Sequence, residues 1–508
     1  MIQRRLQLLR QQMKEHGVTV YIVPSSDCHE SEYVSRHFRA REYITGFTGS
    51  AGTAVITMEE AGLWTDGRYF IQAERQLAGS GITLYRTGEP GVPKIQDYLK
   101  EHLKKGEMLG FDGRVMGAEQ AEEYVKAARD EQADILVTKD LIGEIWTDRP
   151  DIPDAAAWIL EECWSGESAG GKLSRVRTEM EKLGADVHVL ASLCDIAWLL
   201  NLRGNDIPGV PVTLSFLRIT KDTCTWYVRS GAVTEEVRIY LQDQHIQIKP
   251  YDEIYKDMEL LESGQKLLLD KQNVNYRLLS SIPKEISLLN QSNPTEQMKA
   301  VKNPTEIANT RKAHLKESIT FTKFMYWLKM NVGKHEITEV SAAEYLNAFR
   351  QEQEHYLEES FAPICAYGPH GAIVHYSATE ESNVRILPEG FLLVDAGGHY
   401  LEGTTDTTRT IAMGVLTDEQ KRMFTIICRC NLNLANAHFL YGCSGYSLDA
   451  LCRQPLWQMN LDYKHGTGHG VGHLLNVHEG PNGFRWKHPQ GNIPAVLEEG
   501  MITTDEPG

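Results

Sequence analysis

The sequence predicts a globular protein of mixed α/β fold, divided into three domains. Its 508 residues match the length of about three typical domains. Residues 1 to about 145 alternate helix-like and strand-like patterns, as α/β domains do. The next segment repeats this outline at low identity, and a strong helix start at Asn303 opens a third. The predicted domains are therefore residues 1–145, 146–302 and 303–508.

The first segment opens with a helix and a buried strand. An amphipathic pattern through Leu9 reaches Gly17, and the apolar run at 18–23 ends at Pro24. The glycine-rich stretch at 46–52 predicts a tight turn before a second strand at 53–57. Helix and strand thus alternate from the start of the chain.

The second segment follows a linker. Residues 146–150 and the nearby Pro153 are typical of a connection between domains. Residues 184–190 then resemble residues 17–23, and residues 214–220 resemble the later strand of the first segment. Duplication of the first domain is therefore a hypothesis.

The third segment begins with clear helix signals. Asn303 is a good N-cap, Pro304 suits the first helical position, and Glu306 follows at the third. This helix is expected to continue to Gly333. A possible capping box at Thr417 and Gln420 predicts a later helix.

Composition narrows the functional classes. Lys and Arg total 52 against 69 Asp and Glu, a formal charge of −17, and no basic stripe is present for binding nucleic acid. The nine cysteines are scattered, as expected of reduced thiols in a cytoplasmic protein. No secretory h-region or membrane span is found.

Two aspartates flank a predicted hairpin. An apolar run from Phe391 ends at Asp395, glycines permit a reversal, and a Thr-rich strand follows to Thr410. A hairpin centred near Tyr400 would set Asp395 roughly opposite Asp406, with Cβ atoms about 5 Å apart. Such carboxylates repel each other unless cations neutralise them. Taken alone, this pair would be interpreted as capping aspartates of a glycine-rich loop.

A second cluster contains four histidines within fourteen residues, His465, His469, His473 and His478, interleaved with glycines. The glycines disfavour a helix and indicate loop or strand backbone packed close to a neighbour. Glu506 ends a strand just before Pro507. A set of two Asp, one His and one Glu favours Mn²⁺, Co²⁺, Fe²⁺ or a hydrolytic Zn²⁺ pair over a closed structural zinc.

These residues resemble the pita-bread metallopeptidases, the family of methionine aminopeptidases, prolidases and Xaa-Pro aminopeptidases. Asp395, Asp406, His469 and Glu506 match the first four of five metal-ligand positions. His375, on a predicted apolar strand from Ala372 to Tyr376, matches a catalytic histidine, and His465 and His478 match two histidines that contact substrate and intermediate. Residues 64–70 and 196–204 resemble the two creatinase-type N-terminal domains of the long Xaa-Pro aminopeptidases.

The resemblance implies two creatinase-type α/β domains followed by an α+β pita-bread catalytic domain at residues 303–508. It implies two divalent ions, Mn²⁺ before Zn²⁺ or Co²⁺, a homodimer, and peptide substrates with proline at position two. A hydroxide bridging the metals would attack the scissile carbonyl. Glu506 would be ligand and general base, His375 and His478 would stabilise the intermediate, and His465 would line the proline side. Arg68 would lie near the substrate channel or serve packing alone.

Three alternatives remain at this stage: a non-catalytic binding protein, a metal-free hydrolase of the creatinase type, and a prolidase-type dipeptidase. The first two should lack the ligand set. The resemblance also implies a fifth ligand, a second Glu on a strand after Glu506, for which only Pro507 and Gly508 remain. The expectation is that the natural chain continues past Gly508 and that the 508-residue form is poorly active.

Overall fold

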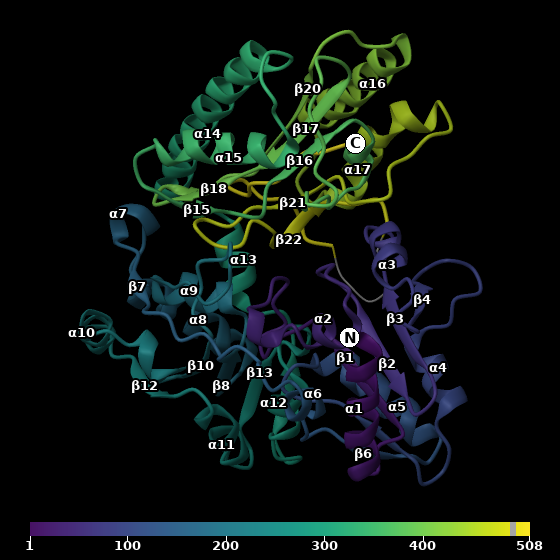
Figure 1. The fold of residues 1–508 in the computed structure, drawn as a ribbon. Helices are drawn as coiled ribbons and strands as arrows, with labels where there is room; N and C mark the ends of the chain where they lie inside the picture. Colours follow the sequence, from purple (N-terminus) through teal and green to yellow (C-terminus); the bar gives the residue numbers. More distant parts are fainter. Residues whose placement is uncertain (488–493) are drawn as a thin grey trace. The chain divides into compact units, whose positions relative to one another are not determined.

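The computed structural model describes residues 1–487 and 494–508 and divides them into two compact units (Figure 1). The first unit comprises residues 1–159, 169–208 and 212–293, and the second comprises residues 160–168, 209–211 and 294–508. Among the described residues, no helix is both long and apolar enough to cross a membrane.

The first unit contains two mixed sheets with one topology. The strand orders are β4-β3-β2-β1-β5-β6 and β12-β11-β10-β8-β13-β14. In each, three central strands are antiparallel and the outer strands join in parallel. The repeated outline predicted from the sequence is therefore present as a repeated strand order.

The strands of the first sheet are β1 (Val20–Pro24), β2 (Thr53–Thr57), β3 (Ala61–Thr65), β4 (Thr83–Arg86), β5 (Met108–Gly110) and β6 (Asp134–Leu136). Those of the second are β8 (Val187–Leu190), β10 (Ser215–Thr220), β11 (Cys224–Val228), β12 (Gln247–Pro250), β13 (Lys266–Leu269) and β14 (Ser287–Asn290). A short pair joins β7 (Trp158–Ile159) to β9 (Leu202–Arg203).

Helices cover both faces of the first sheet. Tyr21 and Val23 of β1 pack into one core, and Val20 and Ile22 pack into the other, because alternate strand residues face opposite sides. The helices are α1 (Ile2–Glu15), α2 (Ala40–Thr45), α3 (Phe70–Gln76), α4 (Ile95–His102), α5 (Ala118–Asp130) and α6 (Leu141–Ile145). The helix through Leu9 and the strand at 53–57 are thus confirmed.

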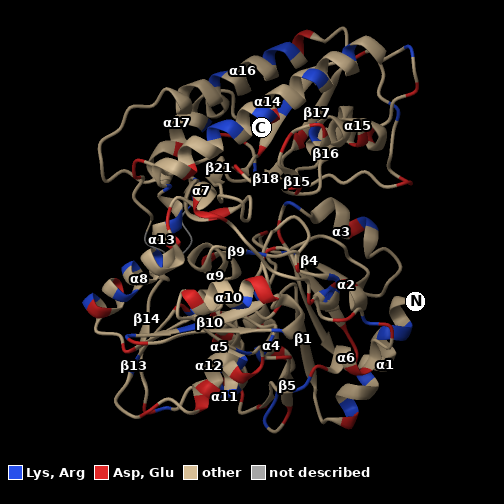
Figure 2. Cartoon of the chain, turned by 90° about the vertical axis from the view of Figure 1, so that its left-hand side faces the viewer, with Lys and Arg blue, Asp and Glu red and all other residues tan. Residues whose placement is uncertain are grey.

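The helices of the second sheet are α8 (Ala169–Leu183), α9 (Leu193–Leu200), α10 (Glu235–Asp243), α11 (Glu253–Glu259) and α12 (Tyr276–Ser280). Single 3₁₀ turns occur at η1 (Arg36–Phe38), η2 (Ser230–Ala232) and η3 (Lys271–Asn273). Acidic and basic residues are interspersed along α8 (Figure 2).

The second unit combines long helices with short antiparallel strands. Its sheets have the orders β15-β18-β19 and β16-β17-β20, with β21 paired to β22. The strands are β15 (Tyr356–Glu359), β16 (Ile364–Tyr367), β17 (Phe391–Ala396), β18 (Gly398–Tyr400), β19 (Gly403–Thr404), β20 (Thr407–Ala412), β21 (Gly468–Gly470) and β22 (Glu479–Phe484). This separation of helices and strands is the predicted α+β arrangement.

The helices of this unit begin where the capping signals predict. Asn303 and Glu306 form a capping box at the start of α14 (Pro304–Asn331), and Thr417 and Gln420 form one at α16 (Asp418–Ala435). The others are α7 (Glu162–Ser165), α13 (Pro294–Ala300), α15 (Glu339–Gln351) and α17 (Gly445–Trp457), with a 3₁₀ turn at η4 (Gly368–Ala372). Apolar side chains of α14 and α15 cover β16, β17 and β20, while α16 and α17 form a second core.

Candidate metal centre

The two predicted aspartates come from one hairpin, whose register differs from the prediction. Asp395 on β17 lies opposite Thr408 on β20, and His399 on β18 lies opposite Thr404 on β19. The chain therefore reverses between residues 401 and 402, one position later than the predicted centre at Tyr400. Asp406 precedes Thr408 by two residues, so Asp395 and Asp406 are diagonal neighbours and not direct partners.

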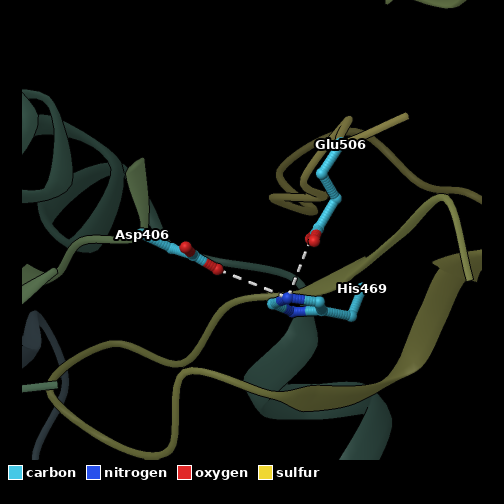
Figure 3. A group of neighbouring side chains, drawn as sticks. All are labelled: Asp406, His469 and Glu506. Carbon is cyan, nitrogen blue, oxygen red and sulfur yellow. Dashed lines mark ion pairs between the residues drawn. The ribbon is translucent and has the colours of Figure 1, made fainter. Parts of the chain in front are cut away.

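Asp406, His469 and Glu506 converge, and each can offer one ligand atom with all three atoms within 4.8 Å of one another (Figure 3). His469 Nε2 lies 3.3 Å from Asp406 Oδ2 and 3.0 Å from Glu506 Oε1. Among the described residues, this is the group of His, Cys, Asp and Glu side chains that could hold a metal ion.

Backbone pairing brings His469 to Glu506. The His469 N–H donates to Thr504 Oγ1 at 2.9 Å, and the Thr504 N–H donates to His469 O at 2.8 Å. A Cβ at Gly468 would lie 2.0 Å from Thr504 O, so the two segments approach this closely only with glycine there. The prediction that these glycines allow close backbone packing is confirmed.

The imidazole of His469 has a defined orientation. Its Nδ1 lies 2.8 Å from Gly470 O, so Nδ1–H donates to that carbonyl and Nε2 faces the carboxylates. Burial alone would lower the pKa of His469, but the bonds and charges of Asp406 and Glu506 outweigh it and raise the pKa to about 10. Burial would raise the pKa of Glu506, yet the bond to His469 lowers it.

Asp395 completes the acidic group. Burial, together with the charges of Asp406 and Glu506, raises the pKa of Asp395 to about 8. Its Oδ1 is shielded from solvent and has no hydrogen-bond partner among the described residues. A shielded, unpartnered carboxylate oxygen beside two further carboxylates is costly unless a cation neutralises it.

The donor chemistry fits divalent metal ions. Three carboxylates and one imidazole form an oxygen-rich set with one nitrogen, which suits Mn²⁺ or a hydrolytic metal pair. A histidine that binds a metal usually donates its other ring N–H to a carbonyl or carboxylate. Here Nδ1–H donates to a backbone carbonyl, which leaves Nε2 for the metal. Asp395, Asp406, His469 and Glu506 can therefore hold a cofactor of this kind.

The other predicted histidines occupy different surroundings. His478 packs edge-on against His469 with ring centroids 4.4 Å apart, and His465 is close enough to help lower the pKa of Glu506. His473 is buried, with Nδ1 3.3 Å from Thr310 Oγ1 and Nε2 3.1 Å from Trp164 O. His473 thus joins separate chain segments through hydrogen bonds. This is consistent with its place outside the proposed ligand set.

The segment that contains His375 is not a strand. The residues predicted as an apolar strand from Ala372 to Tyr376 include the end of the 3₁₀ turn η4, and His375 lies half-buried in a turn after it. The strand prediction was wrong because the run is short and the 3₁₀ turn that begins at Gly368, with Pro369 as its second residue, extends into it. The catalytic role of His375 stays a prediction.

Sequence reasoning missed His314 on α14. Burial lowers its pKa, while the nearby negative charges of Glu317 and Asp406 act in the opposite direction. A single histidine on a long helix carries no sequence signal for a site, and its nearness to Asp406 arises only from tertiary packing.

Three family models match successive parts of the chain. Residues 5–143 and 148–306 each match a Creatinase/Prolidase N-terminal domain, and residues 308–508 match Metallopeptidase family M24.

Relatives match almost the whole chain. A probable Xaa-Pro aminopeptidase P of Sordaria macrospora is 38% identical over 99% of this chain and 84% of its own length. Aminopeptidase P2 of Arabidopsis thaliana is 36% identical over 100% of this chain and 76% of its own. The crystal structure of an X-prolyl aminopeptidase from Caenorhabditis elegans, described as a cytosolic enzyme with a di-nuclear active site, matches with a TM-score of 0.94 and 31% identity, covering 100% of this chain and 85% of its own.

Proposed function

Because the chain belongs to the Xaa-Pro aminopeptidase P family of metallopeptidases, we propose that it removes the N-terminal residue of peptides with proline at position two. It is a hydrolase with a dinuclear metal site, and its fold joins two creatinase-type domains to a pita-bread catalytic domain. The proposed domain boundaries are residues 1–145, 146–302 and 303–508.

The observation that carries this proposal is the convergence of Asp406, His469 and Glu506 beside the shielded oxygen of Asp395. We propose these four residues as metal ligands. When bound, a pair of divalent ions supplies Lewis-acid polarisation of a carbonyl and lowers the pKa of a water molecule. Mn²⁺ is the proposed ion, and a cytoplasmic homodimer is the proposed form.

The protein's own groups then have distinct tasks. Glu506 has a lowered pKa, so it is ionised at neutral pH and can accept the proton of an attacking water. His478, which packs against His469, is proposed to donate a hydrogen bond to the developing oxyanion. His375 is proposed to assist this proton transfer, and His465 to contact the proline side of the substrate.

The test compares metal content and peptide cleavage in three forms of the protein. Wild type should bind Mn²⁺ and cleave an Xaa-Pro-Xaa tripeptide in preference to an Xaa-Ala-Xaa peptide. Asp406→Asn should lose metal and activity. Asp418→Asn, a fully exposed position on α16, is the matched control and should keep both.

Equal metal content in wild type and Asp406→Asn would contradict the ligand assignment. Faster cleavage of Xaa-Pro dipeptides than of tripeptides would instead identify a prolidase-type dipeptidase. Because metal content is measured separately from cleavage, the two outcomes are distinguishable.

A further inference from the structure

The ligand Asp406 lies outside regular secondary structure. It follows β19, which ends at Thr404, and precedes β20, which begins at Thr407. Strand pairing therefore does not fix its backbone. Catalytic geometry needs ligands held to within a fraction of an ångström, so another element must supply the rigidity.

Thr405, the residue before Asp406, is fixed through its backbone and its side chain. It is wholly buried, its N–H donates to Gly398 O at 3.0 Å, and its carbonyl accepts from Ser360 Oγ at 2.8 Å. Its hydroxyl accepts from the Gly398 N–H at 2.9 Å and lies 3.2 Å from both Glu317 Oε2 and Gly398 O. The ionised carboxylate is the stronger acceptor of the two. A Cβ at Gly397 would lie 1.9 Å from Thr405 O, so this approach requires glycine.

Glu317 belongs to a buried ion pair. Its side chain is 1% exposed and that of Arg350 is 0% exposed, with Arg350 Nη2 2.7 Å from Glu317 Oε1. Tyr400 also donates to Glu317 Oε2, at 2.9 Å. A carboxylate bound in this way has a fixed position, and hydrogen bonds to it are stronger than neutral ones.

The second ligand segment is held in the same manner. Thr467 is wholly buried, and its hydroxyl donates to Asp449 Oδ1 in a short hydrogen bond. Its carbonyl accepts from the N–H of Glu506 at 2.8 Å, and its own N–H donates to Phe484 O at 2.8 Å. Thr467 thus contacts the backbone of the candidate ligand Glu506 and lies two residues before the candidate ligand His469.

Asp449 is also paired with a buried arginine. Arg453 Nε lies 2.6 Å from Asp449 Oδ2, and both side chains are 0% exposed. Arg453 donates in addition to the carbonyls of Tyr463 and His465, each at 2.7 Å. The backbone from 463 to 467 is therefore fixed at three points.

We propose that Thr405 and Thr467 are positioning residues for the metal ligands, each locked by the carboxylate of a buried arginine pair, Glu317–Arg350 and Asp449–Arg453. The inference rests on the ligand assignment of the proposed function. The segments that contain Thr405 and Thr467 are unrelated in sequence but share one arrangement. In each, a buried threonine is hydrogen-bonded to a carboxylate that is paired with an arginine. Removing either hydroxyl lets the ligand backbone shift while the ligand side chains and the ion pair remain.

The test separates positioning from stability. The apo protein, prepared with a chelator, is titrated with Mn²⁺ alone by isothermal calorimetry, and its melting temperature is measured in parallel. Thr405→Val and Thr467→Val should each weaken Mn²⁺ binding by about 10–100-fold, the usual effect of losing a group that orients a ligand. Thr405→Ser and Thr467→Ser keep the hydroxyl and should stay within about threefold of wild type.

Thr425→Val is the matched control, because Thr425 is an exposed threonine bonded to its own helix at Lys421 O. It should leave Mn²⁺ affinity unchanged. Should either valine variant fail to fold, the corresponding alanine variant removes the hydroxyl without placing a methyl group against the carboxylate and should show the same weakening.

Three results would overturn the inference: wild-type Mn²⁺ affinity in folded valine or alanine variants, equal losses in the serine variants, or equal losses in Thr425→Val. Asp406→Asn in the same titration tests the ligand assignment. If it loses Mn²⁺ while Thr405→Val does not, the positioning role fails and the proposed function stands. If Asp406→Asn binds as wild type does, the ligand assignment itself fails.

Discussion

The buried ion pair Lys302–Glu479 allows a quantitative prediction of stability. It lies beside the candidate site, since Glu479 directly follows His478. The Lys302 Nζ forms a short contact with Glu479 Oε1, and the two side chains are 1% and 3% exposed. Lys302→Met leaves the Glu479 carboxylate shielded from water, with Lys299 Nζ 4.0 Å away as a weaker partner. Removing one member of a buried pair costs about 3–5 kcal/mol, so this variant should lose roughly that stability.

The matched control is an exposed pair in the same unit. Lys323 and Glu352 lie 2.7 Å apart, with side chains 45% and 54% exposed. Lys323→Met should cost less than about 1 kcal/mol, because exposed pairs contribute little. The double variant Lys302→Met/Glu479→Leu should recover much of the loss, since neither charge of the pair then remains buried without the other.

The assay is hydrogen exchange of peptides that cover residues 294–303 and 479–484, supported by urea unfolding. Exchange reports local opening and so does not require the whole chain to unfold in one step. Protection in these peptides should fall in Lys302→Met, stay near wild type in Lys323→Met and return in the double variant. Equal protection in the two single variants would refute the reasoning.

Three further predictions follow from the site and from the first unit. In an otherwise active form of the enzyme, His375→Ala should lower kcat on Xaa-Pro peptides by roughly 10²–10⁴-fold with metal content unchanged, as a general acid–base group implies. Unchanged turnover or loss of bound metal would contradict the role. Mn²⁺ at about 100 times its dissociation constant should stabilise the apo protein by about 2.7 kcal/mol, read from unfolding midpoints, and Asp406→Asn should abolish the gain. Burial lowers the pKa values of His29 and His188 from 6.5 to about 4. Both histidines are neutral in the folded protein but take up protons when it unfolds. The free energy of unfolding should therefore fall as pH drops from about 6.5 to about 4, by about 3 kcal/mol for each histidine. Acid unfolding should show a smaller fall in His188→Asn than in wild type.

Local signals predicted the helix starts well. The capping boxes at Asn303 and Thr417 depend on residues within one turn, so the sequence alone determines them. The buried strand before Pro24 and the strand at 53–57 also follow from nearby residues. The repeated strand order could be proposed because both halves of the first unit place similar apolar runs in the same sequence.

Strand register was less predictable. Composition showed that a reversal lay between Asp395 and Asp406, but several glycines offered possible centres. The pairing of His399 with Thr404 sets the observed register, and β18 also pairs with the distant β15. Register depends on such non-local contacts, which a single sequence does not display.

Buried pairs such as Glu317–Arg350 could not be predicted either. The two residues lie thirty-three positions apart, and each would ordinarily be assigned to the solvent-exposed face of its helix. Their burial becomes reasonable only when both helices pack on the sheet that carries the ligands. The sequence therefore supplied the candidate metal ligands, but not the buried ion pairs that lie beside them.

The site itself works against the stability of the fold. Asp395, Asp406 and Glu506 gather near one imidazole. Burial first, and then the charges of Asp406 and Glu506, raise the pKa of Asp395, so three negative charges together are unfavourable here. A sequence selected for stability alone would replace at least one carboxylate with a neutral side chain. Retaining all three carboxylates makes sense if a bound cation offsets their repulsion, since a ligand that binds only the folded state adds directly to its stability. This cluster breaks the rule against grouped buried charge, as a metal site does. The sequence pointed to the cluster only through the resemblance of the whole set, because the aspartate pair alone would be interpreted as loop caps.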